Sequence, residues 1–438
     1  MAPKSTPWHW LISPWYAERL SLLTARWQNL KDSLRQPNQS IGRQTVGCAA
    51  THGIHEACNF GCTACYLGKQ ANHQPPLAQS EVKDQLDRIR EALGEGGNVQ
   101  ITSGEVTLLP VEHLIDYCRY AKSIGLSPMV MTHGDTFQQN PDYLKRLLRE
   151  SGLRKLSIHV DSTQRGRQAM PKPSSEKALH PVRDALANLF RSVQKEQAIR
   201  LKLAHTLTID PQNLDQIKDV IPWFLTNLDI FRLISFQPVA QTGRTRSAGG
   251  LSSQVVWERI ESAFQRSLEP HAILFGHPDC TRLGLFAAIL GAKKPLILEA
   301  VRKSNIMDKA FVAAVLRDFG GVVINERPLS EILLKCLGVL VQRPAWLGRI
   351  PLYFLRRSLQ EYRNWGHVFK ALFSFQFRIR LFAVVVHDFM DEATLLSEKG
   401  QERSANCAFQ VPHQGEMVSM CRFNASGLRT ESYAARQV

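Results

Sequence analysis

The apolar positions between residues 46 and 240 alternate between short runs and longer segments with helical spacing. Short apolar runs are typical of buried strands, and apolar residues at every third or fourth position are typical of helices that bury one face. We predict strands at Val99–Ser103, Pro128–Thr132, Lys155–Val160, Arg200–His205 and Phe231–Phe236. The helices predicted between them are Ser80–Leu93, Val111–Ile124, Pro141–Glu150, Ala178–Gln197 and Leu214–Leu228. This alternation indicates an α/β fold with a parallel sheet, either open or closed into a barrel.

The pattern changes on both sides of this region. Before it, Trp, Leu and Arg positions predict an amphipathic basic helix from Pro14 to Leu34, which either meets a partner or packs on the main domain. After Gly249, long helical periods dominate, at Ser253–Leu268, Leu296–Phe319, Pro328–Val341 and Trp346–Phe369, followed by a β-like stretch at Phe377–Val386. We therefore predict an N-terminal appendage (1–45), an α/β domain (46–245) and a mainly helical C-terminal domain (246–438).

Composition and charge narrow the function classes. Hydrophobic residues make up 44% of the 438 positions and charged residues 21%, which excludes disorder as the main state. The 54 Lys and Arg against 39 Asp and Glu give a formal charge of +15. Such a surplus suits nucleic acid, an acidic membrane surface or a phosphorylated substrate, although a solvated basic surface would also account for it.

The cellular compartment decides whether the nine cysteines are expected to form disulfides. Residues 1–13 lack the apolar core of a secretory signal, and the best candidate for a membrane span, Leu329–Val341, is short and interrupted by polar residues. We therefore expect a cytoplasmic protein. In a reducing compartment, clustered thiols indicate metal binding or catalysis more often than disulfides.

Three of these cysteines, Cys58, Cys62 and Cys65, stand within eight residues. Three thiolates on one loop can hold three corners of a [4Fe–4S] cluster and leave its fourth iron open for chemistry. The alternative is a structural zinc site, whose fourth ligand would come from His52, His55 or Cys48.

The surrounding sequence favours the cluster. The C-x3-C-x2-C spacing, with Asn after the first cysteine and Tyr after the last, resembles the radical S-adenosylmethionine (SAM) superfamily. About forty residues on, Thr102–Pro110 resembles that superfamily's Gly-Gly-Glu motif, with Ser103 in place of the first glycine. The resemblance implies that Ser103, Gly104 and Glu105 bind the SAM amino group. Such a role suits a glycine that lets the backbone approach and a carboxylate that pairs with an ammonium.

The resemblance also carries expectations for fold and chemistry. It implies a partial (β/α)6 TIM-like barrel, here followed by the mainly helical C-terminal domain. The cysteine-bound cluster would receive an electron from a donor such as flavodoxin or ferredoxin and cleave SAM. The resulting 5′-deoxyadenosyl radical would remove hydrogen from an unactivated carbon, while the protein supplies orientation.

Other polar residues follow predicted strands, where barrel enzymes place functional groups. His159 and Asp161 face the same side of one strand, and by resemblance this position contacts the SAM ribose. His133 and His205 are either site residues or core histidines. The basic loop Thr163–Arg167 is a candidate for meeting a carboxylate or phosphate.

Four further cysteines, Cys48, Cys280, Cys407 and Cys421, are candidates for an auxiliary iron–sulfur site, as in radical SAM enzymes with C-terminal extensions. The segments His277–Cys280 and Cys421–Asn424 look similar to enzymes that couple lipid chains into membrane-spanning lipids. The alternative is that these are inert buried thiols, which is the reading we favour for Cys118 and Cys336.

The substrate is read from the segment Arg343–Arg380, where cations and aromatic residues interleave with one acid, Glu361. This pattern suits a membrane interface, nucleic acid, or a helical core with a basic face. We expect a lipid or long apolar chain as substrate, with peripheral membrane contact. The alternatives are RNA modification, peptide modification and a non-enzymatic binding module. The lack of a recognisable RNA-binding module counts against RNA modification.

Overall fold

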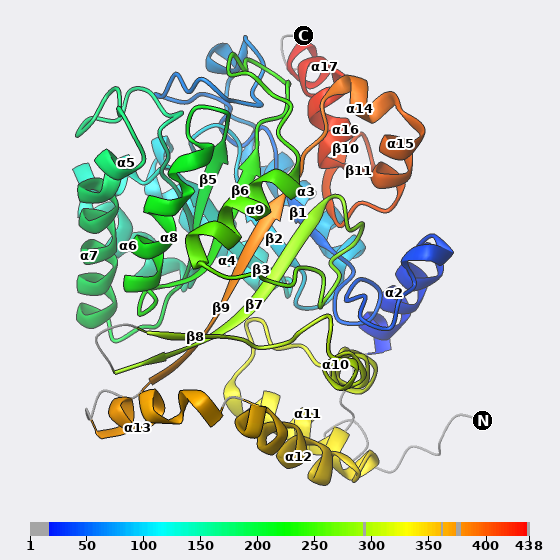
Figure 1. The fold of residues 1–438 in the computed structure, drawn as a ribbon. Helices are drawn as coiled ribbons and strands as arrows, with labels where there is room; N and C mark the ends of the chain where they lie inside the picture. Colours follow the sequence, from blue (N-terminus) through cyan, green and yellow to red (C-terminus); the bar gives the residue numbers. More distant parts are fainter. Residues whose placement is uncertain (1–16, 292–294, 361, 374–377, 436–438) are drawn as a thin grey trace.

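A sheet of eleven strands runs through the molecule (Figure 1), a computed structural model that describes residues 17–291, 295–360, 362–373 and 378–435. The strand order is β11-β10-β1-β2-β3-β4-β5-β6-β9-β7-β8. Strands β1 to β6 are parallel neighbours in chain order. Their bounds are β1 Cys48–Ala50, β2 Asn98–Ile101, β3 Ser127–Thr132, β4 Lys155–His159, β5 Lys202–Ile209 and β6 Phe231–Pro238.

Each of these strands leads into helical structure before the next strand, which confirms the predicted partial (β/α)6 barrel. The main helices are α3 Gln79–Leu93, α4 Val111–Ser123, α5 Asp135–Gln139, α6 Pro141–Ser151, α7 His180–Glu196, α8 Ile217–Thr226 and α9 Ser253–Phe264. Local sequence sets the bounds of α6 in particular. Asn140 accepts a hydrogen bond from the Tyr143 N–H at its start, and Gly152 ends it in the left-handed region, with φ of +66°.

The C-terminal part is rich in helices, as expected, and it also adds strands to both ends of the sheet. At one end β9 (Arg378–His387) runs parallel to β6, followed by antiparallel β7 (Thr281–Leu290) and β8 (Leu296–Glu299). At the other, β10 (Phe409–His413) runs parallel to β1 and antiparallel to β11 (Glu416–Ser419).

The helix predicted over Leu296–Phe319 is wrong at its start, because β8 takes its first residues and α10 spans only Ile306–Phe319. Leu296–Glu299 is an apolar run whose strand state depends on pairing with β7, a partner that local spacing does not reveal. The remaining C-terminal helices are α11 Leu329–Gln342, α12 Trp346–Gln360, α13 Trp365–Phe373, α14 Glu392–Leu396, α15 Glu398–Ala405, α16 Met420–Ala425 and α17 Leu428–Ala434.

The predicted N-terminal helix is present as α2 (Ala17–Gln28); Trp8, Trp10 and Trp15 lie outside the described residues. The helix packs on the barrel. Leu23 is buried, and the buried Arg19 guanidinium donates to the backbone oxygens of Glu95 and Gln44, both at 2.6 Å. For this part of the segment, the structure favours packing on the main domain.

Candidate functional site

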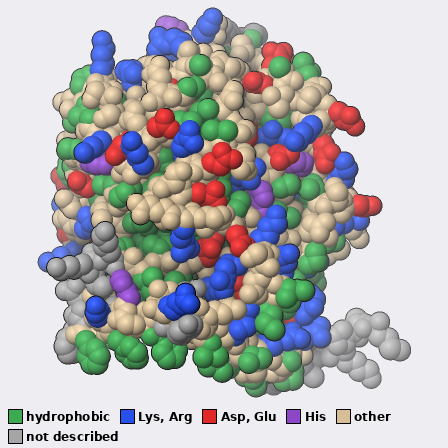
Figure 2. Space-filling view, in the orientation of Figure 1, with side chains coloured by type: hydrophobic (Ala, Val, Ile, Leu, Met, Phe, Trp, Pro, Cys, Tyr) green, Lys and Arg blue, Asp and Glu red, His purple; other side chains and the backbone are tan. Residues whose placement is uncertain are grey.

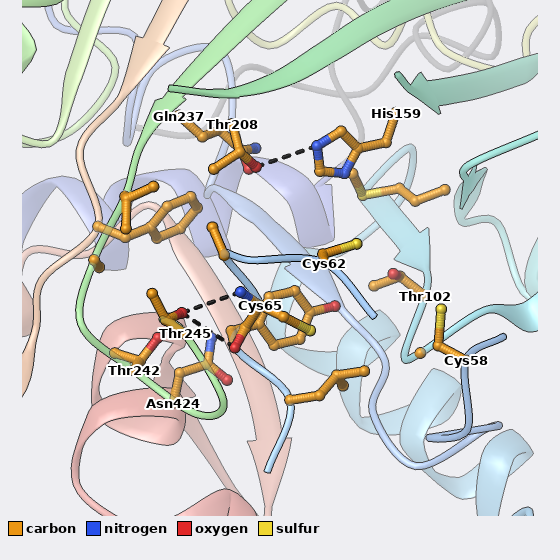
Figure 3. A pocket seen from close by; sticks show the side chains of 18 of the residues that line it. Cys58, Cys62, Cys65, Thr102, His159, Thr208, Gln237, Thr242, Thr245 and Asn424 are labelled. Carbon is orange, nitrogen blue, oxygen red and sulfur yellow. Dashed lines mark hydrogen bonds between the residues drawn. The ribbon is translucent and has the colours of Figure 1, made fainter. Parts of the chain in front are cut away.

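A cavity opens at the carboxyl ends of the barrel strands (Figure 3). Thr132, His159, Thr208 and Gln237 line it from the ends of β3 to β6, and the cysteine loop after β1 forms a second wall. About 1310 Å³ within it is free of protein atoms, open solvent at its mouth included. The cavity therefore lies where barrel folds place their active sites.

The three clustered cysteines all line this cavity (Figure 3). Their loop is held by backbone hydrogen bonds to the loop after β4, from Gly61 N to Arg165 O and from Thr63 N to Thr163 O, each 2.9 Å. Burial raises the pKa of the Cys58 thiol to about 12 and that of Cys62 further still. A metal bound here would have to displace these protons, because metals bind the thiolate form.

Two residues after β6 also contact this loop and were not identified from the sequence. Arg244 Nε lies 3.3 Å from Cys65 Sγ, and Thr245 Oγ1 accepts a 3.0 Å hydrogen bond from Cys65 N. A guanidinium beside a thiolate stabilises its negative charge. The sequence feature that could have identified them is the segment Gly243–Arg246, whose cations follow the end of a predicted strand.

The Ser-Gly-Glu segment is bound directly to the residues before Cys58. Gly104 N donates to His55 O at 2.9 Å, and Glu105 N donates to Ala57 O at 3.0 Å. A Cβ at position 104 would lie 2.1 Å from Glu56 O, closer than any side chain tolerates. Glycine is therefore required for this approach, which brings the two sequence motifs together.

Glu105 is buried, and its own loop and the end of β3 surround the carboxylate. Oε1 accepts from Thr107 N, Thr107 Oγ1 and Thr132 Oγ1, at 3.1, 2.6 and 2.7 Å, and Oε2 accepts from His133 N at 2.9 Å. Burial alone would raise the pKa of Glu105, but His133 and the threonine hydrogen bonds lower it below its ordinary value. Glu105 thus organises the end of β3, and its contact with the SAM ammonium stays a prediction.

His133 lies in the cavity wall rather than in the apolar core. Its ring stacks on Phe60, with centroids 3.8 Å apart, and its Nε2 lies 2.9 Å from Asn59 Oδ1. Arg167 covers the other side of this unit, 5.2 Å from the Phe60 ring, and donates to His133 O. Arg167 is buried in these contacts, so it stabilises the cysteine loop instead of forming part of an exposed anion site.

His159 and Asp161 are adjacent, as predicted, but only His159 lines the cavity. Its Nε2 lies 2.6 Å from Asp161 Oδ2. The same atom lies 3.2 Å from Thr208 Oγ1, a contact drawn in Figure 3. Asp161 is fully buried behind it and also accepts hydrogen bonds from Thr163 and Thr208 N. Asp161 therefore orients His159, whose contact with a ribose remains a prediction. His205, in contrast, is buried in the core against Trp223.

One wall of the cavity is apolar and, apart from Val239, comes from the C-terminal part. It consists of Val239, Phe389, Met390, Phe409 and Met420, with Asn424 as a polar neighbour. These side chains follow β6 and β9 or belong to β10 and α16. Sequence patterns did not identify this wall, because residues distant along the chain combine to form it.

The C-terminal helix α17 holds the cysteine loop from behind. Buried Arg429 donates two hydrogen bonds to the buried carboxylate of Glu56, at 2.9 and 3.0 Å, and Tyr433 Oη donates to the same carboxylate at 3.0 Å. The Arg429 guanidinium also covers the ring of Tyr66, at 4.8 Å. This buried ion pair couples the end of the described chain to the residues that precede Cys58.

The four other cysteines converge on one buried region, although they are far apart in the sequence. Cys48 begins β1 beside Phe409, Cys280 O accepts from Asp388 N, and Cys421 Sγ accepts from Met390 N at 3.4 Å. Burial, and next a neighbouring cysteine, raises the pKa of Cys48 to about 12 and of Cys407 to about 11. Cys118 is buried in a helix, as expected.

Within the described ranges, no three His, Cys, Asp or Glu side chains are placed to hold one metal ion. Cys58, Cys62 and Cys65 all line one cavity, and three thiolates can hold three irons of a four-iron cluster. The cavity also offers space for SAM beside them.

Comparisons with known proteins agree with this site. Residues 54–222 match the family model described as Radical SAM superfamily. A 7,8-dihydro-6-hydroxymethylpterin dimethyltransferase of Methanocaldococcus jannaschii is 23% identical over 194 residues, which cover 44% of this chain and 36% of that protein. The chain thus spans about a third of the length of this curated relative.

Solved structures show a partial likeness. SuiB of Streptococcus suis is 15% identical, with a TM-score of 0.37 over 50% of this chain and 47% of that one. The enzyme anSMEcpe with bound AdoMet is 13% identical, with a TM-score of 0.37 over 50% of this chain and 59% of that one. Such scores carry no conclusion about function.

The family match and the cysteine-lined cavity coincide, since the matched residues include Cys58, Cys62, Cys65 and Glu105. The class uses a [4Fe–4S] cluster and SAM. Residues 54–222 are therefore a radical SAM domain, an enzyme domain of that class.

Proposed function

We propose that this protein removes a hydrogen atom from an unactivated carbon of a lipid or other long apolar chain. One observation carries the proposal: the cysteine loop and the Ser-Gly-Glu segment line the same cavity as a group of apolar side chains, Val239, Phe389, Met390, Phe409 and Met420. An apolar wall gains little from a nucleotide or a charged peptide, but it buries methylene groups favourably, at about 0.8 kcal/mol per CH₂.

The residues divide the work by position. Cys58, Cys62 and Cys65 would hold the cluster, while Glu105 and His159 would bind and orient SAM from the opposite strand ends. When bound, the reduced cluster and SAM supply a carbon radical that takes the hydrogen atom. The apolar wall excludes water and holds the substrate carbon near that radical, which limits side reactions.

Assays of reconstituted protein test this proposal. Anaerobically reconstituted and reduced protein should form 5′-deoxyadenosine, and a lipid with deuterated chains should pass deuterium into that product. The variant with all three loop cysteines changed to Ala should lose both activities, while Cys336→Ala, a control elsewhere in the fold, should keep them. Cleavage of SAM without deuterium transfer from any lipid would reject the substrate and retain the radical SAM chemistry.

The dimethyltransferase relative favours a second candidate, transfer of a methyl group from SAM to a substrate carbon. Product analysis separates the two candidates. Methyl transfer from SAM yields S-adenosylhomocysteine and a substrate heavier by one methylene, whereas hydrogen abstraction alone yields neither. RNA or peptide modification would instead be supported by deuterium transfer from those substrates.

A further inference from the structure

Three consecutive helices, α11, α12 and α13, each expose a stripe of large apolar side chains. On α11 the stripe recurs at every fourth residue, and α12 and α13 show similar helical spacing. Each side chain in these stripes is between 44% and 70% exposed, apart from Phe373 at 79%. We call the following set the α11–α13 face: Leu329, Leu333, Leu337, Val341, Leu352, Leu355, Leu359, Trp365, Phe369 and Phe373.

The inner sides of α11 and α12 are already packed. Val339 and Trp346 are buried against Ala314 and Val322, and Trp346 Nε1 donates to Asp318 Oδ2 at 2.9 Å. The exposed stripes are thus additional apolar surface, beyond what the fold needs for its core. Contiguous exposed patches of this kind mark interaction sites in folded proteins.

The face lies at the opposite end of the barrel from the cavity. In Figure 1, α11, α12 and α13 form a layer along the lower edge, and Figure 2 shows hydrophobic side chains along that edge with Lys and Arg just above them. Strand β9 begins at Arg378, soon after α13, and runs parallel to β6. The helices therefore border the amino ends of the strands, whereas the cavity lies at their carboxyl ends.

The charges near the α11–α13 face indicate which kind of partner it binds. Residues 343–380 contain eight Lys or Arg and one acid, Glu361. Arg349 on α12 and Lys370 on α13 are exposed, and so is Arg363 in the turn between these two helices. Apolar side chains flanked by cations and aromatic rings suit an anionic bilayer, where chains enter the hydrocarbon and cations meet phosphates.

We propose that the α11–α13 face binds the surface of an anionic lipid bilayer, with its helices lying in the plane of the interface. No helix in the described segments is long and apolar enough to cross a membrane. A second copy fits less well, because a twofold contact would bring the same cations face to face. Nucleic acid also fits less well, because aliphatic leucines provide no surface for base stacking. The proposal stands on this face alone, independently of the substrate.

Vesicle sedimentation of the full chain tests the proposal. The protein should sediment with vesicles of equal parts phosphatidylcholine and phosphatidylglycerol, and less with phosphatidylcholine alone or at high salt. Leu352→Asp should weaken binding by about tenfold or more, because a Leu side chain entering hydrocarbon contributes at least about one factor of ten. Leu396→Asp is the matched control, since Leu396 on α14 is 71% exposed and Leu352 is 66% exposed.

Iron content and circular dichroism should be unchanged in both variants, which separates lost binding from lost folding. Equal binding by Leu352→Asp and Leu396→Asp would overturn the proposal. So would a concentration-dependent dimer that Leu352→Asp abolishes while vesicle binding persists. Binding to RNA but not to vesicles at physiological salt would also overturn it. Because none of these readouts measures turnover, they remain decisive whatever the enzyme's substrate is.

Discussion

At the scale of single residues, the site depends on close backbone approach and on buried charge. Gly104 and Glu105 show the two kinds of constraint, one steric and one electrostatic. The sequence motifs identified both residues, because their chemistry is local. Their partners in the fold, among them Thr107 and Thr132, were not identified, because a carboxylate's donors can come from any neighbouring strand end.

Gly104→Ala should disrupt the contact between the two motifs. The new methyl group would press on Glu56 O, and the backbone on either side would have to separate. We expect a lower melting temperature and weaker SAM binding, measured by thermal unfolding and equilibrium dialysis. Gly61→Ala, in the same cysteine loop, is the control, since no atom lies within 4 Å of the position that its new methyl group would take. Equal behaviour of the two variants would contradict the steric argument.

Glu105→Gln should keep the cluster but weaken SAM binding about tenfold, because a neutral amide replaces charge-assisted contacts worth roughly 1.5–3 kcal/mol. Iron analysis and SAM dialysis measure the two effects separately. Glu112→Gln, on the exposed side of α4, should change neither. Loss of iron in Glu105→Gln alone would show that the carboxylate supports the cluster and not SAM.

Asp161 gives a pH-dependent contribution to stability. Burial alone would raise its pKa, but His159 and the hydrogen bonds from Thr163 and Thr208 lower it from 3.8 to about 2. A carboxyl group with a lowered pKa stabilises the folded protein when the pH is above the ordinary pKa of Asp. That stability is lost as the pH falls through the pKa of the folded protein. Asp161→Asn should therefore cost on the order of 2 kcal/mol at neutral pH and roughly half of that near pH 3. Urea unfolding at both pH values checks this, and a cost that does not change with pH would contradict it.

At the scale of elements, the alternation of apolar runs predicted five of the six barrel strands and the helices between them. Strand β1 was missed because three residues, Cys48–Ala50, are too short to show a period. Strand β7 was missed because it pairs with β9, a segment distant in the sequence, and β8 was missed because its strand state depends on pairing with β7. The apolar wall of the cavity depends on the same long-range pairing, and it was missed for the same reason.

Helix α17 should matter for the cysteine loop through its buried ion pair. Arg429→Met leaves the Glu56 carboxylate buried without its cation, which typically costs about 3–5 kcal/mol. We expect a lower melting temperature, measured by thermal unfolding. We also expect easier loss of iron, measured as iron release to a chelator. Arg422→Met is the control, because Arg422 is exposed on α16. Adding Glu56→Gln to Arg429→Met should recover part of the loss; a purely additive effect would exclude the pairing.

At the scale of the whole molecule, four cysteines from distant parts of the chain lie in β1, just before β7, just before β10 and in α16. We predict that Cys48, Cys280, Cys407 and Cys421 bind additional iron. The variant with the three loop cysteines changed to Ala should retain iron after reconstitution, and adding Cys407→Ala should remove it. Cys118→Ala in the same background is the control. A folded triple variant that holds no iron would contradict this second site.

The pairing of β10 with β1 has a consequence for how the protein is made. During translation the cysteine loop leaves the ribosome together with β1, long before strand β10, which borders β1, and helix α17, which holds Glu56. Contacts between such distant segments form slowly, and they form last. The nascent loop therefore lacks its contacts with β10 and α17 until the intervening residues have been made. We therefore expect iron and sulfide to reach the cysteine loop more easily before the C-terminal segments dock than afterwards.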